Sequence, residues 1–227
     1  MRFLIATFAA LAICLGSPAS AQTPPGPAEM AIYTGLHAAA AKGDLAALTA
    51  LIAAKADIAE RDGHGRTAVH IAGHAGHRDV VRALAVAGAD LNALESRRYD
   101  LITIAAVRDD AEMVRLALSL GANARNITSP YDGTALIAAA HLGHDDVVKA
   151  LITGGAPLDH VNNLGWTAAI EAVILGNGGR RHQETLRALV EAGANVKIAD
   201  RDGATPLDHA KRRGFAAMIV ILTNSRP

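Results

Sequence analysis

The sequence is short of aromatic residues, of net charge and of long apolar runs, and each shortage narrows what the chain can be. Aromatic residues make up only 3% although 51% are hydrophobic, so the core must be built from Ala, Leu, Ile and Val. That mixture favours closely packed helices, because Ala has the highest helix propensity. The 22 basic residues match 22 acidic ones, which argues against nucleic-acid binding. No apolar run reaches the roughly 20 residues of a membrane-spanning helix.

Cysteine is almost absent, and Cys14 lies in an N-terminal stretch unlike the rest of the chain. Residues 1–21 carry Arg2 near their start, followed by an apolar run and a final Ala-Ser-Ala motif. This pattern predicts a signal peptide cleaved after Ala21. The exported chain would then have no thiol for a disulfide, a nucleophile or a zinc site. Lipidation of Cys14 is disfavoured, because the preceding Ile13 is not a small residue. We therefore expect a periplasmic or secreted protein.

From residue 31 onward the chain repeats itself with a period close to 33 residues. Six copies align at their starts, which are Thr34, Thr67, Asp100, Thr134, Thr167 and Thr205. A second landmark follows the first five starts, at Lys55-Ala56, Gly88-Ala89, Gly121-Ala122, Gly155-Ala156 and Gly193-Ala194. The third copy keeps only the apolar rhythm of the others, yet leaving it out would open a gap of two periods. Such a fixed period indicates stacked units, none of which can bury its apolar surface alone.

The copies resemble the ankyrin repeat, whose signature is Thr-Pro-Leu-His-x-Ala at a period of 33 residues. The strongest matches are residues 65–72 (GRTAVHIA) and 202–207 (DGATPL). The resemblance covers about residues 31–222 and is closest to secreted bacterial ankyrin proteins. It implies an all-α ankyrin-repeat solenoid of six helix-turn-helix repeats, joined by β-hairpin-like fingers.

The expected domain organisation is a signal peptide (1–21), a Pro-rich linker (22–30) and an ankyrin-repeat domain (31–227). The six repeats span about 31–61, 62–94, 95–128, 129–161, 162–199 and 200–227. In the last repeat a basic run, Lys211 to Arg213, should face solvent, while Met218, Ile219, Ile221 and Leu222 close the core. A polar outer face of this kind keeps a solenoid soluble.

The spacing within each copy is explained by helix chemistry. Thr at each start, or Asp100 in the third copy, can cap the first helix by accepting from its free N–H groups. Pro206 then falls in the first turn, where its missing N–H costs nothing. The glycine after each second helix supplies the left-handed residue that ends it. Lys55 replaces this glycine in the first repeat, at an expected cost of about 1 kcal/mol.

Ten histidines raise the question of a metal site, most sharply at His70, His74 and His77. Imidazoles four residues apart on a helix can share a metal. However, the resemblance implies that His70 ties the backbone to the neighbouring Thr. His74 and His77 recur two repeats later as His141 and His144, and layers spaced roughly 8–10 Å apart put the two pairs out of reach of one ion. The sequence predicts structural histidines, with no metal and no cofactor.

Other candidates for chemistry have simpler explanations. Asp109-Asp110 and Asp145-Asp146 fall where a second helix begins, and we interpret them as caps that suit the helix dipole. The glycine run at residues 176–179 lacks the Gly-Lys-Ser/Thr ending of a phosphate loop. No Gly-x-Ser-x-Gly motif is present. The sequence therefore predicts no catalytic residue and no enzyme.

The fifth repeat is five residues longer than its neighbours, and the extra residues lie within 177–184. One interpretation is a tolerated loop extension, which costs little entropy. The other is a basic loop tip, Arg180-Arg181-His182, that contacts an acidic partner. The sequence leaves both open.

The few aromatic residues lie at one position of the repeat. Tyr33, Tyr99 and Trp166 stand directly before the repeat start, Arg66 occupies the same position in the second repeat, and Tyr131 lies two residues further out in the fourth. The resemblance implies that this region, the finger and the entry to the first helix, contacts partners. Tyr, Trp and Arg dominate interface hot spots. The alternative is that bulky residues here serve local packing.

Together these observations predict an exported, monomeric module that binds another protein as a scaffold, holder or inhibitor. An alternative is a secreted effector or immunity protein that acts on a foreign or host partner through the same surface. A metal-dependent accessory enzyme is less favoured, because no polar pocket converges. Fold alone does not decide among these functions.

Overall fold

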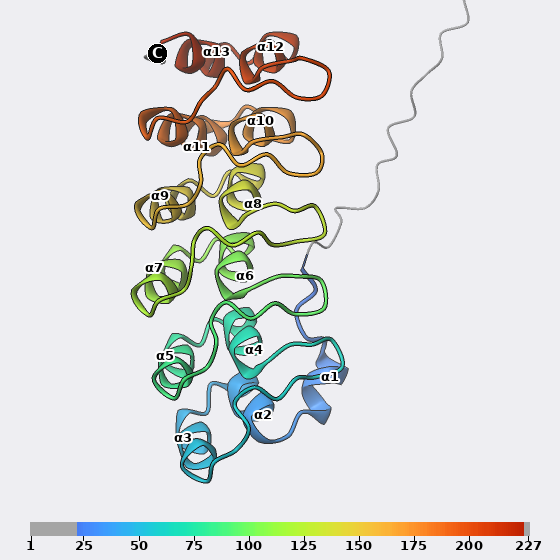
Figure 1. Cartoon of the computed structure of the whole chain (residues 1–227), viewed down its shortest axis with the longest axis vertical. Helices are drawn as coiled ribbons and strands as arrows, with labels where there is room; N and C mark the ends of the chain where they lie inside the picture. Colours follow the sequence, from blue (N-terminus) through green and yellow to red (C-terminus); the bar gives the residue numbers. More distant parts are fainter. Residues whose placement is uncertain (1–21, 225–227) are drawn as a thin grey trace, which may run out of the picture.

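The computed structural model describes residues 22–224, so the expected signal peptide lies outside the described residues. The described part forms thirteen helices and no strand (Figure 1). After α1 (Pro27–Ile32) come six helix pairs: α2 (Gly35–Lys42) and α3 (Leu45–Ala53), α4 (Ala68–Ala75) and α5 (Arg78–Val86), α6 (Leu101–Val107) and α7 (Ala111–Ser119), α8 (Ala135–Leu142) and α9 (Asp145–Thr153), α10 (Ala168–Ile174) and α11 (Arg180–Glu191), α12 (Pro206–Arg212) and α13 (Ala216–Thr223).

The six pairs stack into a solenoid of two helical layers (Figure 1). The inner layer runs from α2 through α4, α6, α8 and α10 to α12, and the outer layer from α3 to α13, each helix packing on its neighbours in the same layer. The third repeat, which lacks the signature, forms α6 and α7 like the others. The expected fold of six helix-turn-helix repeats is therefore confirmed.

The inner helices begin much as the capping chemistry predicts, with one correction. Asp100 accepts from the Thr103 N–H at 2.8 Å, and the side chains of Thr134, Thr167 and Thr205 cap in the same way. Thr34 makes no side-chain cap. Thr67 forms a reciprocal capping box with His70: the Thr67 N–H donates to His70 Nδ1 at 3.1 Å, and the Thr67 hydroxyl lies 2.9 Å from the same nitrogen. Capping by all the threonines was therefore a wrong expectation at Thr34.

The outer helices end as predicted. Gly88, Gly121, Gly155 and Gly193 all have φ between 79° and 95°, the left-handed conformation that stops a helix. Lys55 adopts the same conformation with φ 62°. Of the carboxylates expected to cap α7 and α9, only Asp110 does so, accepting from Met113 N–H at 2.9 Å. Asp109 sits at φ 59° after α6 and Asp145 lies inside α9, so both are free to form ion pairs instead.

The core is aliphatic and runs the length of the stack. Its largest fully buried side chains include Leu36, Leu48, Ile71, Leu84, Leu101, Ile104, Met113, Leu136, Leu151, Ile170 and Leu186. In the last repeat Met218, Ile221 and Leu222 are buried while residues 211–213 are exposed, which confirms the expected cap. Ile219 is half-buried.

The extra residues of the fifth repeat lengthen a helix rather than a loop. The outer helix α11 has 12 residues, whereas α9 has 9, and Gly179 is its N-cap. Arg180, Arg181 and His182 therefore form its first turn, so both interpretations were wrong in placing these residues in a loop. The added turn brings Arg181 within hydrogen-bonding distance of residues in the third and fourth repeats. The structural reason is that glycines 178 and 179 end the connection early, so that helix-favouring residues follow at once.

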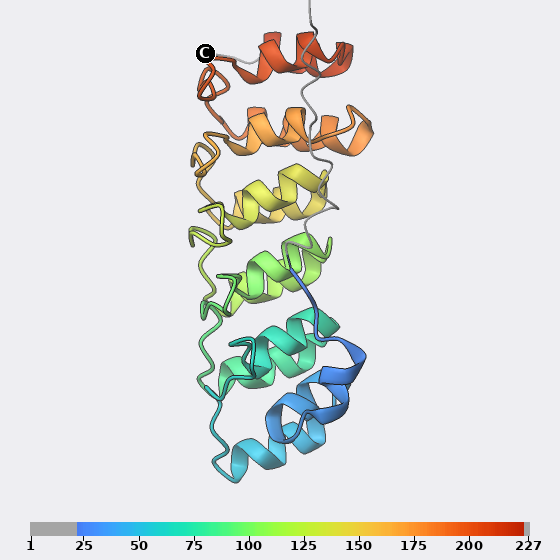
Figure 2. The same ribbon diagram turned by 90° about the vertical axis from the view of Figure 1, so that its right-hand side faces the viewer.

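The segment expected to be a Pro-rich linker folds against the repeats. Pro27 occupies the first turn of α1, and the Glu29 carboxylate accepts from the Gly26 N–H at 2.7 Å, so the helix has a defined start. Residues 22–26, which precede α1, and α1 itself lie along the inner-helix side of the first three repeats, beside the fingers (Figure 2). Residues 22–33 are called the N-terminal strap below.

Candidate functional site

Each finger, the connection from an outer helix to the next inner helix, is held by one polar side chain five residues before the repeat start. These residues are Asp62, Glu95, Ser129, Asn162 and Asp200, and each accepts from backbone N–H groups within its own finger. Asp62, for example, accepts from His64 and Arg66 at 2.8 and 2.9 Å. The finger shape is therefore fixed locally.

Neighbouring fingers are also joined to one another. The Ser96 N–H donates to the His64 carbonyl at 3.0 Å, Ser129 to Arg98 at 2.9 Å, and Asn163 to Tyr131 at 2.9 Å. Because these hydrogen bonds join main-chain atoms, they keep successive fingers in register whatever their side chains are. Fingers and inner helices together form one continuous surface, called the inner face below (Figure 1).

The residues predicted to contact a partner are not equally accessible on this face. Tyr131 is 45% exposed, and Tyr33 and Trp166 are half-buried. Arg66 and Tyr99 are each only 3% exposed. The strap contacts Arg66 and contributes to the cavity that Tyr99 lines, so these two residues do not reach solvent in this structure.

Arg66 lies at the centre of a buried network of charges. Its Nε donates to Asp62 at 2.7 Å, and its Nη2 donates to the Glu29 carboxylate and to Tyr33 Oη. The Tyr33 hydroxyl donates in turn to Asp62 at 2.6 Å. Burial opposes ionisation of Asp62, but the hydrogen bonds from Tyr33 and Arg66 outweigh it and hold the Asp62 pKa at about 2. The pKa of Tyr33 is raised by burial and by the same hydrogen bond.

Arg180 and Arg181 differ in their surroundings. Arg180 is exposed at the first position of α11. Arg181 donates to Asp109 at 2.9 Å and to Asp145 at 3.2 Å, joining the fifth repeat to the third and fourth. Its guanidinium is thus paired within the chain. A role for these two residues in partner binding stays a prediction.

The histidines stabilise the repeat structure. His70 Nε2 lies 2.9 Å from the Ala93 carbonyl and 3.2 Å from that of Tyr99, while Nδ1 pairs with Thr67. Burial lowers the pKa of His70 to about 4, and of His74 likewise, so both rings are neutral at pH 7. Within residues 22–224 no cluster of three metal-ligating side chains is present.

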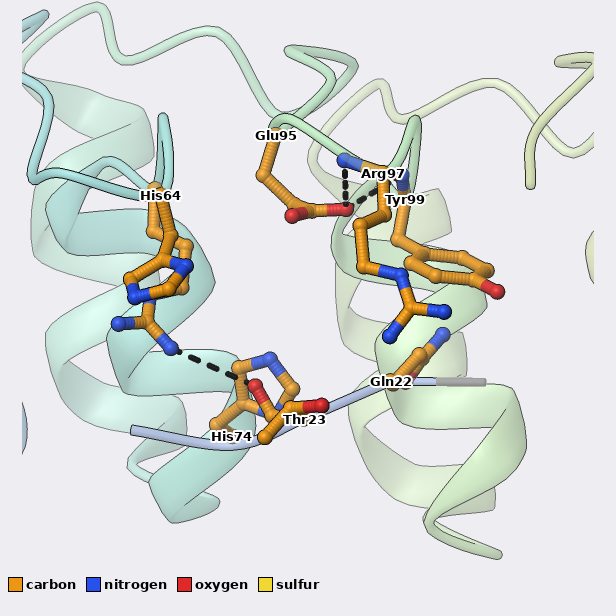
Figure 3. Close-up of a pocket in the computed structure, with 8 residues that line it drawn as sticks. Gln22, Thr23, His64, His74, Glu95, Arg97 and Tyr99 are labelled. Carbon is orange, nitrogen blue, oxygen red and sulfur yellow. Dashed lines mark hydrogen bonds between the residues drawn. The ribbon is translucent and has the colours of Figure 1, made fainter. Parts of the chain in front are cut away.

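A cavity of about 340 Å³ lies between the strap and the inner face (Figure 3). His64, Arg66, His74, Glu95, Arg97 and Tyr99 line it on the side of the repeats, and Gln22 and Thr23 line it on the side of the strap. The Glu95 carboxylate accepts from the backbone N–H groups of Arg97 and Tyr99 at 2.9 and 3.1 Å. The floor of this cavity thus carries two arginines beside one carboxylate.

Sequence reasoning missed two features of this site. Glu29 was placed in a linker, although a glutamate two residues after a proline at a helix start is a recognisable first-turn signal. The row of finger anchors was also missed; it is visible as a polar residue five positions before each of the last five repeat starts. No local signal placed Glu29 beside Arg66, since 37 residues separate them.

Comparison with known proteins agrees with this architecture. Family models for ankyrin repeats match residues 36–85 (many copies) and 101–200 (three copies). A crystal structure of an ankyrin repeat domain from Acinetobacter baumannii AYE is 40% identical, with a TM-score of 0.80 over 84% of this chain and 96% of that one. The chain belongs to the ankyrin-repeat family. The match to residues 36–85 includes His64, Arg66 and His74 of the cavity.

Two other relatives of this ankyrin-repeat protein share less of its sequence. The ankyrin repeat protein YahD of Escherichia coli (strain K12) is 34% identical over 98 residues, which are 43% of this chain and about half, 49%, of that protein. A structure of a predatory endopeptidase from Bdellovibrio bacteriovorus in complex with an immunity protein matches with a TM-score of 0.72 at 23% identity, over 86% of this chain and 99% of that one. At that identity the likeness shows the fold alone.

Ankyrin repeats are protein-interaction scaffolds, so membership of the family implies a protein partner. Among residues 22–224, no helix has the length and apolar character needed to span a membrane.

Proposed function

We propose that this ankyrin-repeat protein is exported to the periplasm, where it holds, scaffolds or inhibits another protein through its inner face, without catalysis. The observation that carries the proposal is a group of exposed apolar side chains on two neighbouring fingers. Ile127 and Tyr131 are 47% and 45% exposed, and Val161 and Leu164 on the next finger are 44% and 39% exposed.

Tyr131 and Leu164 occupy the same position of their repeats, three residues before the repeat start. Their two fingers are tied together by the bond from Asn163 to the Tyr131 carbonyl. Apolar side chains presented on a preorganised backbone lose little entropy on binding, which favours a protein partner. Export is supported by the signal-peptide pattern of residues 1–21.

The test is capture of the partner in cells. We expect the tagged wild-type protein, cross-linked in periplasm and identified by mass spectrometry, to retain a defined protein that the double variant Tyr131→Ala, Leu164→Ala loses. Val86→Ala is the matched control, because Val86 is 81% exposed on the opposite, outer layer. Identical capture by all three proteins would refute the proposed face. Recovery of the chain only in the cytoplasm, with its N-terminus intact, would refute export.

A second candidate is an immunity or effector protein whose partner is foreign or belongs to a host. The complex of an endopeptidase with an immunity protein, to which this chain is similar in fold, supports considering it. The identity of the captured protein distinguishes the two, since a cognate toxin or peptidase would favour immunity.

A further inference from the structure

The N-terminal strap is held on the inner face mainly by polar contacts. The Thr23 carbonyl accepts from Arg66 at 3.4 Å, the Glu29 carboxylate accepts from Arg66 Nη2, and the same carboxylate lies 2.9 Å from His64 Nε2. Tyr33, at the strap's end, hydrogen-bonds to Asp62. Glu29 therefore supplies the principal charge that fixes the strap to the repeats.

Apolar packing of the strap is slight. Helix α1 contains no buried residue, and its Met30 and Ile32 side chains are 42% and 78% exposed. Within the strap only Pro25 is buried. The strap is thus held by the contacts of Glu29 and Tyr33 with the Arg66–Asp62 pair rather than by apolar burial, so its release would leave the aliphatic core intact.

The strap also fills its groove incompletely. Gln22 points its side-chain amide into the cavity (Figure 3), where both amide atoms are buried without a hydrogen-bond partner among the described residues. Leaving buried polar atoms unpaired is unfavourable. A segment with a better-matched group at this point would bind more tightly than the strap does.

The floor of the groove contacts the carboxylate of the strap. Arg66 is paired with Asp62 at 2.7 Å and also donates to Glu29, whose carboxylate lies 2.9 Å from His64 Nε2. In the row three residues before each repeat start, His64 and Arg97 lie at the groove and Tyr131 and Leu164 follow on the next two fingers. The row thus changes from basic to apolar along the inner face.

We propose that the groove beneath residues 22–33 binds an acidic, proline-containing segment of the partner protein, and that the strap is an intramolecular occupant whose Glu29 stands in for the partner's carboxylate. This inference rests on the proposed function, because it names the chemistry of the partner that the inner face takes. Opening of the strap exposes Arg66 and makes the groove continuous with the apolar fingers.

The test uses a labelled synthetic peptide with the sequence of residues 22–33, added to the purified protein and followed by fluorescence anisotropy. In wild-type protein the tethered strap competes, so we expect weak binding. Glu29→Gln in the protein weakens the tethered strap and should raise the peptide's affinity about tenfold, because the competent state becomes more populated. The matched control Glu112→Gln removes an exposed carboxylate of α7, on the outer layer, and should leave the affinity at the wild-type value.

Changes in the peptide test the chemistry. A peptide carrying the Glu29→Gln change, or a scrambled peptide of equal composition, should bind the Glu29→Gln protein at least about tenfold more weakly than the native sequence does. Raising the salt concentration should weaken native binding. A thermal melt of each variant, equal to that of wild type, establishes that the repeats remain folded.

Several results would overturn the proposal. Equal affinity of wild-type and Glu29→Gln protein for the peptide would show that the strap does not occupy the site. Equal binding of the scrambled peptide would reduce the groove to a nonspecific basic surface. A dimer of the wild-type protein that dissociates on adding peptide would assign the groove to the strap of a second copy. None of these results bears on capture through Tyr131 and Leu164, so the two proposals fail separately.

Discussion

The residue that follows each of the first five outer helices adopts a left-handed φ, and this requirement decides which amino acid occurs there. Four repeats place glycine there with φ between 79° and 95°, and a Cβ built on Gly88 would meet nothing within 4 Å. Steric room is therefore not what selects glycine at this position. The left-handed φ itself does, and Lys55 adopts it at φ 62° in the first repeat.

Lys55→Gly should therefore stabilise the protein by about 0.5–1 kcal/mol, because relief of the left-handed strain exceeds the added entropy of the unfolded chain. For a chain of this size that corresponds to a rise in Tm of about 2–4 °C. Differential scanning calorimetry measures it. The reverse change in the next repeat, Gly88→Lys, is the matched control and should lower Tm. An unchanged or lower Tm for Lys55→Gly would contradict the assignment of strain.

Single residues also show which features could be predicted from the sequence and which could not. The repeat period was enough to predict the left-handed Lys55 and the cap at Asp100, and the family resemblance implied the structural role of His70; all three depend on neighbours within about 30 residues. Arg66 looked like a finger residue available to a partner. Its burial depends on Glu29, outside the repeats, and no period extends to that segment.

At the scale of one element, α11 shows how an insertion can connect repeats. The added turn carries Arg181 to Asp109 and Asp145, while His182, which follows it, lies 3.0 Å from the His141 carbonyl at the end of α8. His144 makes the matching contact one repeat earlier, to the Ala106 carbonyl of α6 at 2.8 Å. The insertion thus keeps the usual contact between repeats and adds a second one. The sequence located the insertion but could not show that it would be helical.

Arg181→Ala should destabilise the protein by about 0.5–1 kcal/mol, since two partly exposed ion pairs between repeats are lost. Urea unfolding at low salt measures the change, and the difference from wild type should shrink in 0.5 M NaCl, where roughly 4 Å of screening length remains. Arg187→Ala is the control, because Arg187 is similarly exposed but pairs with Glu184 inside the same helix. A loss equal in both variants would contradict a role in joining repeats.

At the scale of the whole molecule, the aliphatic core runs through all six repeats. Stability also depends on buried histidines that stay neutral and on a buried carboxylate that is ion-paired. His70 and His74 are held neutral with a pKa of about 4, and Asp62 is held ionised with a pKa of about 2. These groups all lie in the second repeat or the finger leading to it, beneath or beside the strap. Changes of pH therefore act first at that end of the solenoid.

The unfolding free energy should fall as pH drops below neutral. Unfolded histidine binds a proton near pH 6.5 whereas His70 and His74 bind one only near pH 4, so each contributes stability that is complete above pH 6.5 and is lost as pH falls to 4. The loss is on the order of 3 kcal/mol for each. The Asp62 contribution follows, declining between about pH 4 and 2. Urea titrations at several pH values measure the total, and NMR titration showing His70 protonated near pH 6.5 would contradict it.

The short connection between α1 and α2 determines how readily another ligand can displace the strap. Only Tyr33 and Thr34 separate Ile32 from Gly35, so a displaced strap remains tethered beside its groove. Such a tether gives an effective local concentration in the millimolar range. A ligand for the groove that binds micromolar in isolation would thus need far higher concentrations to displace it, and the protein would respond only once its partner exceeded that threshold.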